Sequence, residues 1–179
     1  VSVFQNFATL DLISNGRAEI VAGRGSFTGS FPLFGLDIED YEDLFEEKLE
    51  LLLKIRDDEF VTWKGRFRAP LNNQPVYPRP IQEKLPIYRG VGGTTASFIK
   101  AGQKGLPLVV AVIGGQTANF RPLVDLYKEA FVAAGHPKAE MKICLHSLGF
   151  VGNSHKESID TYFPGYEKMF NEIGQERGW

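Results

Sequence analysis

Residues 85–115, LPIYRGVGGTTASFIKAGQKGLPLVVAVIGG, carry the clearest structural pattern in the chain. A short apolar run leads into a glycine-rich turn, a helical stretch follows, and a second apolar run over 106–113 ends in another pair of glycines. Short apolar runs bounded by glycine are typical of buried strands, and the stretch between them is long enough for a helix. The segment therefore predicts one β-α-β unit.

The turn after the first of these strands combines glycine with hydroxyl side chains. Gly93 is followed by Thr94 and Thr95, and Ser97 comes shortly after. Glycine lets the backbone take a positive φ and approach a ligand closely, and the first N–H groups of a helix have no partner within it, so this turn can hold an anion such as phosphate. An ordinary N-cap at Thr94 or Thr95 explains the same residues. Because a short glycine cluster is a weak motif, the local sequence favours the cap, and the flanking segments must decide.

Composition limits the classes of protein to consider. The chain has 179 residues, of which 43% are hydrophobic, and this suits one domain with a buried core. A formal net charge of -2 without a block of like charge gives no reason to expect nucleic acid or a membrane surface as partner. Cys144 is the single cysteine, so we expect a reducing cytoplasm. No histidine-supported spacing predicts a metal site.

Outside the β-α-β unit the sequence predicts alternating helices and strands. The expected helices are 1–14, 37–55, 120–134 and 160–177, the last interrupted near Pro164-Gly165, and the expected strands lie within 17–25 and 141–151. Acidic residues crowd the first half of the second helix, and we expect them to form its solvated face. Alternation of this kind predicts a parallel sheet, either open or a barrel. Four strands are about half of a (β/α)8 TIM barrel, so we expect a partial barrel that begins and ends at a helix.

Two segments interrupt the alternation. Residues 26–36 form an aromatic and glycine-rich loop that is too long for a simple connection, and such loops often cover a site. Residues 57–84 form an insertion: strands at 61–63 and 66–68 are expected to make a hairpin around Lys64-Gly65, and four prolines then enforce an extended crossing. We therefore expect a single domain over 1–179 that carries this hairpin and proline-rich insertion.

Several individual side chains are candidates for chemistry. Arg24 follows a predicted strand, where ligands gather in parallel α/β folds, although pairing with a nearby carboxylate explains it equally well. His146 lies within a strand and is interpreted as a structural, hydrogen-bonded histidine rather than a catalytic one. Cys144, in the same strand, is expected to be buried. His136 and His155 are expected to face solvent.

Four segments together resemble one known family. ATLDLISNGRAEIVAGRG, FPLFG, PRPIQEKLPIYRGVGG and GLPLVVAVIGG are similar to the flavin-dependent, luciferase-like monooxygenases, which include bacterial luciferases and alkanesulfonate monooxygenases. The similarity extends over essentially the whole chain. Members are TIM barrels of roughly twice this length, so the resemblance implies the middle and later part of the barrel, from the helix before strand four to the helix after strand seven.

The resemblance implies a cofactor and a position for it. It implies reduced FMN at the C-terminal edge of the barrel, supplied by a separate NAD(P)H-dependent flavin reductase, and oxygen-dependent oxidation of a small organic substrate such as an aldehyde or a sulfonate. Some similar proteins use a deazaflavin and transfer hydride instead. By this resemblance Arg24 lies near the flavin phosphate, and Gly93, Thr94, Thr95 and Ser97 meet that phosphate through backbone N–H and hydroxyl groups.

The resemblance also has gaps. Gly23 stands where luciferases have a reactive cysteine, so light emission is not expected, and the substrate-side residues of the first three barrel strands have no counterpart here, which leaves the catalytic residues unassigned. Three functions remain open: an oxygenase of which this chain is a fragment or a half that needs a partner, a shortened non-catalytic flavin-binding relative, and an inactive remnant. Because half a barrel leaves its edge strands unpaired, we expect a homo-oligomer or pairing with the missing barrel part.

Overall fold

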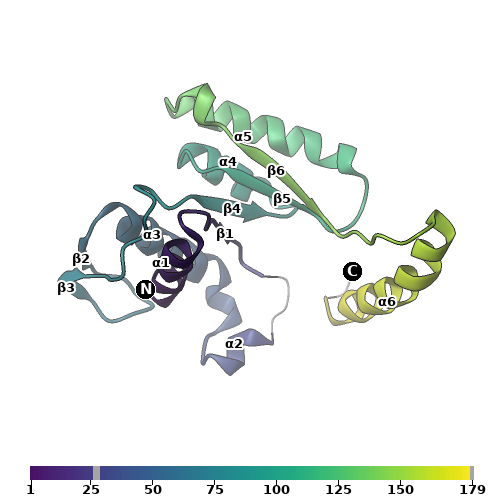
Figure 1. The fold of residues 1–179 in the computed structure, drawn as a ribbon, viewed down its shortest axis with the longest axis horizontal. Helices are drawn as coiled ribbons and strands as arrows, with labels where there is room; N and C mark the ends of the chain where they lie inside the picture. Colours follow the sequence, from purple (N-terminus) through teal and green to yellow (C-terminus); the bar gives the residue numbers. More distant parts are fainter. Residues whose placement is uncertain (26–28, 178–179) are drawn as a thin grey trace. The chain divides into compact units, whose positions relative to one another are not determined.

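The computed structural model describes residues 1–25 and 29–177. The chain divides into two compact units, Val1–His146 and Ser147–Trp179, and each is treated by itself. A four-stranded sheet in the order β1-β4-β5-β6 is the centre of the fold (Figure 1). Its strands are β1 (Ile20–Ala22), β4 (Ile87–Val91), β5 (Leu108–Val112) and β6 (Ile143–Ser147).

The sheet is parallel, as the sequence predicts. Ile20 of β1 lies beside Ile87 of β4, and Arg89 lies beside Leu108 of β5. β6 follows β5 in the order, and the Leu108 N–H donates to the Lys142 carbonyl at 2.9 Å just before β6. Over the described residues the strands form an open sheet, which is the α/β arrangement of a partial barrel.

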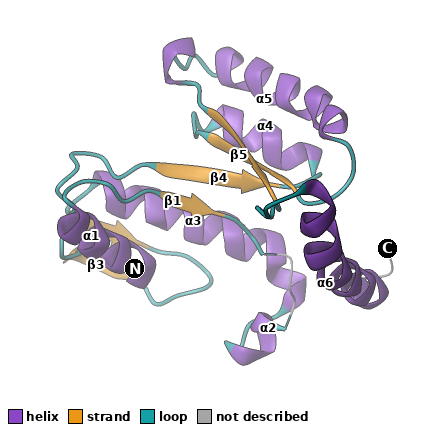
Figure 2. Ribbon diagram, turned by 45° about the vertical axis from the view of Figure 1, so that its right-hand side comes forward, coloured by secondary structure: helices purple, strands orange, loops and turns teal. Residues whose placement is uncertain are grey.

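Helices pack against the sheet, and the side chains of β4 are mostly buried whereas those of β6 are mostly exposed. The helices of the first unit, in chain order, are α1 (Ser2–Ser14), α2 (Ser30–Leu33), η1 (Ile38–Asp40), α3 (Tyr41–Asp57), α4 (Thr95–Gln103), η2 (Thr117–Phe120), α5 (Arg121–Ala133) and η3 (Lys138–Glu140). One core cluster joins α1, β1 and α3, and a second joins α4, α5 and β5. Figure 2 shows α4 and α5 side by side. The short turn α2 lies within the loop expected at 26–36, of which 26–28 fall outside the described residues.

The end of α1 and the start of β1 are held by a buried carboxylate. Asn15 ends the helix in the left-handed region at φ 56, as its Asn-Gly sequence indicates. Asp11 is fully buried and accepts the Ala18 N–H at 3.2 Å and the Gln82 N–H at 3.0 Å. Burial alone would raise the pKa of Asp11, but the hydrogen bonds from Gln82 and Ala18 hold this pKa below its ordinary value. Asp11 thereby joins α1, β1 and the proline-rich segment.

Most of the acidic residues at 37–50 are exposed, as expected, but Glu46 is partly buried. Glu46 is bound to Arg89 of β4, with Nη2 to Oε1 at 2.5 Å, and to Lys100 of α4 at 3.3 Å. Glu50 pairs with Lys104 at 2.8 Å. The expectation therefore holds for the exposed residues and fails for Glu46, because the charged flanks of the apolar stripe also meet strand and helix neighbours.

The hairpin is present, but its second strand lies later than expected. β2 (Phe60–Trp63) pairs antiparallel with β3 (Leu71–Pro75), so the expected strand at 66–68 is wrong. Glu47 of α3 accepts the backbone N–H groups of Arg66 at 2.7 Å and Phe67 at 3.0 Å. These contacts hold the turn against α3 and remove its N–H groups from the hairpin ladder.

Helix α5 matches the sequence pattern and contacts α4 closely. Pro122 lies in its first turn, and Tyr127 and Phe131 face the second core cluster. The Tyr127 hydroxyl donates to the Leu106 carbonyl at 3.1 Å, and burial raises the pKa of Tyr127 to about 12. His136, expected in solvent, is partly covered: its ring lies 5.1 Å from that of Phe131.

The second unit consists of α6 (His155–Arg177) and the residues that lead into it. The helix begins earlier than expected because Ser154 accepts the Glu157 N–H at 3.2 Å, while the Glu157 carboxylate accepts the Asn153 N–H at 3.2 Å. This is a near match to a capping box, which the S-x-x-E spacing encodes. The expected interruption is also wrong, since α6 continues through Pro164. His155 is exposed, as expected.

None of the helices within the described ranges is long and apolar enough to cross a membrane.

Candidate functional site

The structure brings Arg24 together with the turn before α4. The Arg24 guanidinium donates from Nη2 to the Thr94 hydroxyl and to the Ser97 hydroxyl, each at 3.3 Å. Ser97 is buried, with 3% of its surface exposed. Residues that are far apart in the sequence, and that were expected at one site, are therefore in contact.

The parallel sheet accounts for this contact. Ala22, the last residue of β1, lies beside Arg89 of β4, so both strands run toward the same edge. Arg24 comes just after the end of β1, and Thr94 comes just after the end of β4. Loops that leave neighbouring parallel strands at their carboxyl ends emerge together, and this edge is where ligands bind in folds of this class.

The N-terminus of α4 lacks the side-chain cap that was the alternative interpretation. Thr94 occupies the N-cap position in an extended conformation, with φ -83 and ψ 110, and its side chain forms no capping hydrogen bond. Its hydroxyl accepts from Arg24 instead. The first N–H groups of a helix have no acceptor within the helix, so those at Thr95 and Ala96 remain available to a ligand.

The electrostatics of this edge suit an anion. A helix N-terminus carries about half a positive charge, and the Arg24 guanidinium adds a full one close by. Two positive features repel each other unless an anion or a carboxylate lies between them. Among the described residues, a Cβ atom added at Gly92 or Gly93 would meet nothing within 4 Å. Neither glycine has a positive φ, so of the two reasons that the sequence suggested for them the left-handed backbone is wrong, whereas close approach of a ligand stays a prediction.

Two residues of α3 that the sequence did not single out complete the surroundings of Arg24. The guanidinium lies over the Tyr41 ring, 5.1 Å from its centroid, and the Tyr41 hydroxyl donates to the Gly25 carbonyl at 2.7 Å. Glu42 forms an ion pair with Arg24 through Nη1. The sequence left two interpretations of Arg24, pairing with a carboxylate and contact with a ligand. The structure shows the carboxylate partner, and it also shows Arg24 in contact with the turn at which the ligand was expected. The acidic residues at the start of α3 could have indicated a counter-ion for Arg24, but which of them faces Arg24 depends on how the helix packs in the fold.

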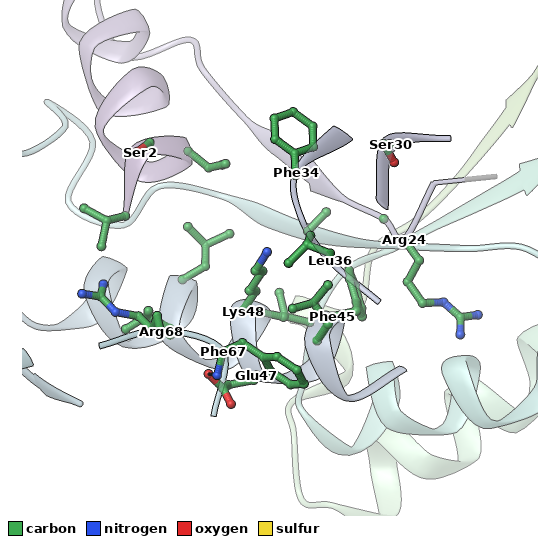
Figure 3. Close-up of a pocket in the computed structure, with 18 of the residues that line it drawn as sticks. Ser2, Arg24, Ser30, Phe34, Leu36, Phe45, Glu47, Lys48, Phe67 and Arg68 are labelled. Atoms are coloured by element: carbon green, nitrogen blue, oxygen red, sulfur yellow. Dashed lines mark hydrogen bonds between the residues drawn. The ribbon is translucent and has the colours of Figure 1, made fainter. Parts of the chain in front are cut away.

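A cavity of about 700 Å³ lies beside this site. Its walls are mostly apolar and come from α1, β1, α2, α3 and the hairpin turn. In Figure 3 the Arg24 guanidinium points away from Phe45 and Leu36, whereas Lys48 lies among the lining residues. The arginine belongs to the rim of the cavity, and its charged end faces the turn before α4.

Two further side chains that the sequence singled out, Cys144 and His146, lie on β6. Cys144 is exposed, so the expectation that it is buried is wrong. His146 is also exposed, and within the described part of the chain its ring forms no hydrogen bond. The reason is the same for both: β6 is an outer strand of the sheet, and the sequence does not reveal which strand lies at the edge.

A sequence model of the luciferase-like monooxygenases matches residues 1–178. The F420-dependent glucose-6-phosphate dehydrogenase of Amycolatopsis mediterranei (strain U-32) is 26% identical over 135 residues, which are 74% of this chain and 40% of that protein. The chain spans about half the length of the curated relatives that it matches over most of its own length.

Solved structures show the same fold. Monooxygenase RslO1 from Streptomyces bottropensis superimposes with a TM-score of 0.79 at 21% identity, over 97% of this chain and 52% of that one. The oxygenating constituent of 3,6-diketocamphane monooxygenase from Pseudomonas putida, a type II Baeyer-Villiger monooxygenase solved with FMN, superimposes with a TM-score of 0.67 at 18% identity, over 96% of this chain and 55% of that one.

Proposed function

The chain belongs to the luciferase-like monooxygenase family, and from this premise we propose that it binds the phosphate of reduced FMN for the oxygen-dependent oxidation of a small organic substrate. The contact of Arg24 with Thr94 and Ser97 at the uncapped N-terminus of α4 carries the proposal. An arginine and a helix N-terminus are both common phosphate-binding features in proteins.

Each group would have a separate role in binding. The first N–H groups of α4 would donate to phosphate oxygens, and the Arg24 guanidinium would neutralise their charge. Thr94 and Ser97 would orient the guanidinium through Nη2. The Tyr41 ring would limit its movement. When bound, reduced flavin supplies the reactivity toward oxygen, whereas the protein binds and orients it.

A deazaflavin is the second candidate cofactor. The relative from Amycolatopsis mediterranei is named for its dependence on F420, and the oxygenating constituent from Pseudomonas putida was solved with FMN. Both cofactors carry a phosphate at the end of a ribityl chain, so the site described above would accept either. With a deazaflavin the chain would serve in hydride transfer instead of oxygenation.

Partners follow from the cofactor and from the sheet. A co-substrate FMN requires a separate NAD(P)H-dependent flavin reductase to reduce it. The outer strands β1 and β6 also carry exposed apolar side chains, Val21 at 57% and Leu145 at 62% exposure. We therefore propose that the sheet pairs with a second copy or with the remaining part of a barrel. Light scattering of the purified chain tests the pairing with a second copy, and a monomer of 20.0 kDa at all concentrations would contradict that alternative.

Titration with FMN and with riboflavin tests the proposed site, because the two differ by the phosphate alone. We expect FMN to bind at least tenfold more tightly than riboflavin, since a charge-assisted phosphate contact contributes about 1.5–3 kcal/mol. Arg24→Ala should reduce this difference, because only the N–H groups of α4 would then remain to bind the phosphate. Flavin fluorescence, recorded with oxidised and with anaerobically reduced ligand, measures both affinities. Equal affinity of the wild-type chain for FMN and riboflavin would refute the phosphate assignment.

A further inference from the structure

The Arg24 guanidinium is shared between two different kinds of partner. Its Nη2 atom donates to the Thr94 and Ser97 hydroxyls, each at 3.3 Å, and its Nη1 atom is bound by the Glu42 carboxylate. Arginine binds phosphate best when two of its N–H groups reach two oxygens. Nη1 would supply the second N–H group of such a contact, and in the structure Glu42 is bound to Nη1.

The other acidic residues at the start of α3 are engaged elsewhere. Asp40 pairs with Arg66 at 2.7 Å, and Asp43 lies 3.8 Å from the same arginine. Arg66 belongs to the hairpin turn, which α3 holds through Glu47. Glu42 therefore stands out in this acidic turn because its charge is directed at the candidate anion site.

Arg24 does not depend on Glu42 for its orientation. Its side chain is only 15% exposed, it lies over the Tyr41 ring, and its Nη2 atom is fixed by two hydroxyls. The Glu42 side chain is 53% exposed, so it can rotate into water and keep its charge solvated. Because the Glu42 end of this pair is exposed, its carboxylate regains hydration when it leaves, so it can be exchanged for another anion.

We propose that Glu42 is an internal competitor for the anion site, and this inference rests on the phosphate-binding function proposed above. Its carboxylate neutralises Arg24 while the site is empty, and an incoming phosphate takes its place on Nη1 as Glu42 turns toward solvent. Glu42 therefore lowers the affinity for every anion. An anion that binds Arg24 alone does not displace Glu42. A phosphate does displace it, because the phosphate also accepts hydrogen bonds from the first N–H groups of α4.

The test compares Glu42→Gln with Asp43→Asn. Both substitutions remove one negative charge from the same helical turn, but only the first removes it from Arg24. Calorimetric titration with inorganic phosphate, and fluorescence titration with FMN, should show about three- to tenfold tighter binding for Glu42→Gln, because a half-exposed pair and its repulsion of the ligand are lost. Asp43→Asn should change either affinity by less than about twofold, since salt screens its charge.

The outcomes separate this inference from the function on which it rests. If Arg24→Ala weakens phosphate binding and Glu42→Gln binds no more tightly than the wild type, the anion site stands and the competitor role of Glu42 is refuted. Equal gains in Glu42→Gln and Asp43→Asn would also refute it, because the effect would then be one of general charge. If neither the wild type nor Glu42→Gln binds phosphate or FMN, the proposed function and this inference both fail. Circular dichroism of each variant confirms that the fold is retained.

Discussion

The Arg89 guanidinium of β4 lies against the Glu46 carboxylate of α3, with Nη1 to Oε2 at 3.1 Å and Nη2 to Oε1 at 2.5 Å. Arg89 is 1% exposed and lies over the Phe45 ring at 5.1 Å, and its Nε atom has no hydrogen-bond partner among the residues that the structure describes. A charge buried this deeply is tolerated because the carboxylate neutralises it. The pair joins the second strand of the sheet to the helix that carries Tyr41 and Glu42.

Replacing Glu46 by Leu should strongly destabilise the chain, because it leaves the Arg89 charge buried and uncompensated. We expect the free energy of unfolding to fall by about 3–5 kcal/mol, as for other broken buried pairs. The double variant Glu46→Leu with Arg89→Met should recover much of this loss, since both charges are then absent. Urea unfolding followed by circular dichroism measures each value, and a double variant no more stable than Glu46→Leu would contradict the explanation.

Acid should destabilise the fold through Asp11 and Glu46. Burial alone would raise the pKa of Glu46, but hydrogen bonds and charge from Arg89 and Lys100 hold this pKa below its ordinary value, and the pKa of Asp11 is also lowered. A carboxyl group with a lowered folded pKa contributes stability above its unfolded pKa of about 4, and this contribution is lost as the pH falls through the folded value.

Urea midpoints should therefore be nearly constant between about pH 7 and 5 and should decrease below about pH 4. In Asp11→Asn the decrease should be smaller, from a lower starting stability, because the group that titrates is absent. A wild-type midpoint that does not change down to about pH 3 would show that these carboxylates do not control acid stability.

Gly102→Ala should destabilise the packing of α4 on α5. A Cβ atom at this position would lie 2.5 Å from the Tyr127 carbonyl oxygen and 2.8 Å from the Phe131 nitrogen, and neither backbone atom can move aside freely. We expect a loss of about 1–3 kcal/mol, although alanine favours the helix itself by about 1 kcal/mol.

The matched control for this glycine is Gly165→Ala in α6, where an added Cβ meets nothing within 4 Å. Without a clash, only the helix propensity of alanine remains, so the helical circular dichroism signal should stay the same or increase. Thermal unfolding measures the effect of Gly102→Ala, and an unchanged midpoint would mean that the two helices separate without loss of stability.

Removing the hydroxyls that contact Arg24 should weaken phosphate binding without abolishing it. In Thr94→Ala with Ser97→Ala, Nη2 loses both of its acceptors, so the guanidinium is less restricted when the ligand arrives. We expect about a three- to tenfold loss of FMN affinity and little change for riboflavin, because these two hydrogen bonds orient the guanidinium and do not themselves contact the phosphate.

The control for the hydroxyls is Thr9→Ala, which removes a hydroxyl that donates to the Gln5 carbonyl within α1. Fluorescence titration should give wild-type affinities for this variant. An equal loss for FMN and riboflavin in Thr94→Ala with Ser97→Ala would indicate a general distortion of the turn rather than a phosphate contact.

Local pattern predicted most of the fold. The structure confirms the β-α-β unit at 85–115, the parallel sheet and the helices α1, α3 and α5. These elements could be predicted because the spacing of apolar residues, and glycine or Asn-Gly at the ends of elements, are visible in residues that neighbour one another in the sequence. The second hairpin strand was misplaced because a carboxylate of α3 accepts the N–H groups of Arg66 and Phe67. No local pattern indicates such a contact with a distant helix.

The candidate site was only partly accessible from the sequence. Arg24, Thr94 and Ser97 were expected at one place by resemblance, and the structure shows them in contact. Tyr41 and Glu42 were missed because their position opposite Arg24 depends on how α3 crosses β1. The exposure of Cys144 likewise follows from the position of β6 at an edge, which sheet order alone determines.

The position of the site between β1 and β4 links ligand binding to the integrity of the sheet. β1 has three residues and is an outer strand, and Arg24 follows it, whereas the other contacts follow β4. An anion bound by Arg24 and by the start of α4 would link β1 to β4. Local separation of β1 from the sheet would move Arg24 away from the other residues of the site and weaken anion binding. A ligand that binds only the folded chain stabilises it in proportion to the logarithm of the ligand concentration. The concentration of the cofactor would therefore determine what fraction of the chains keep β1 paired with β4.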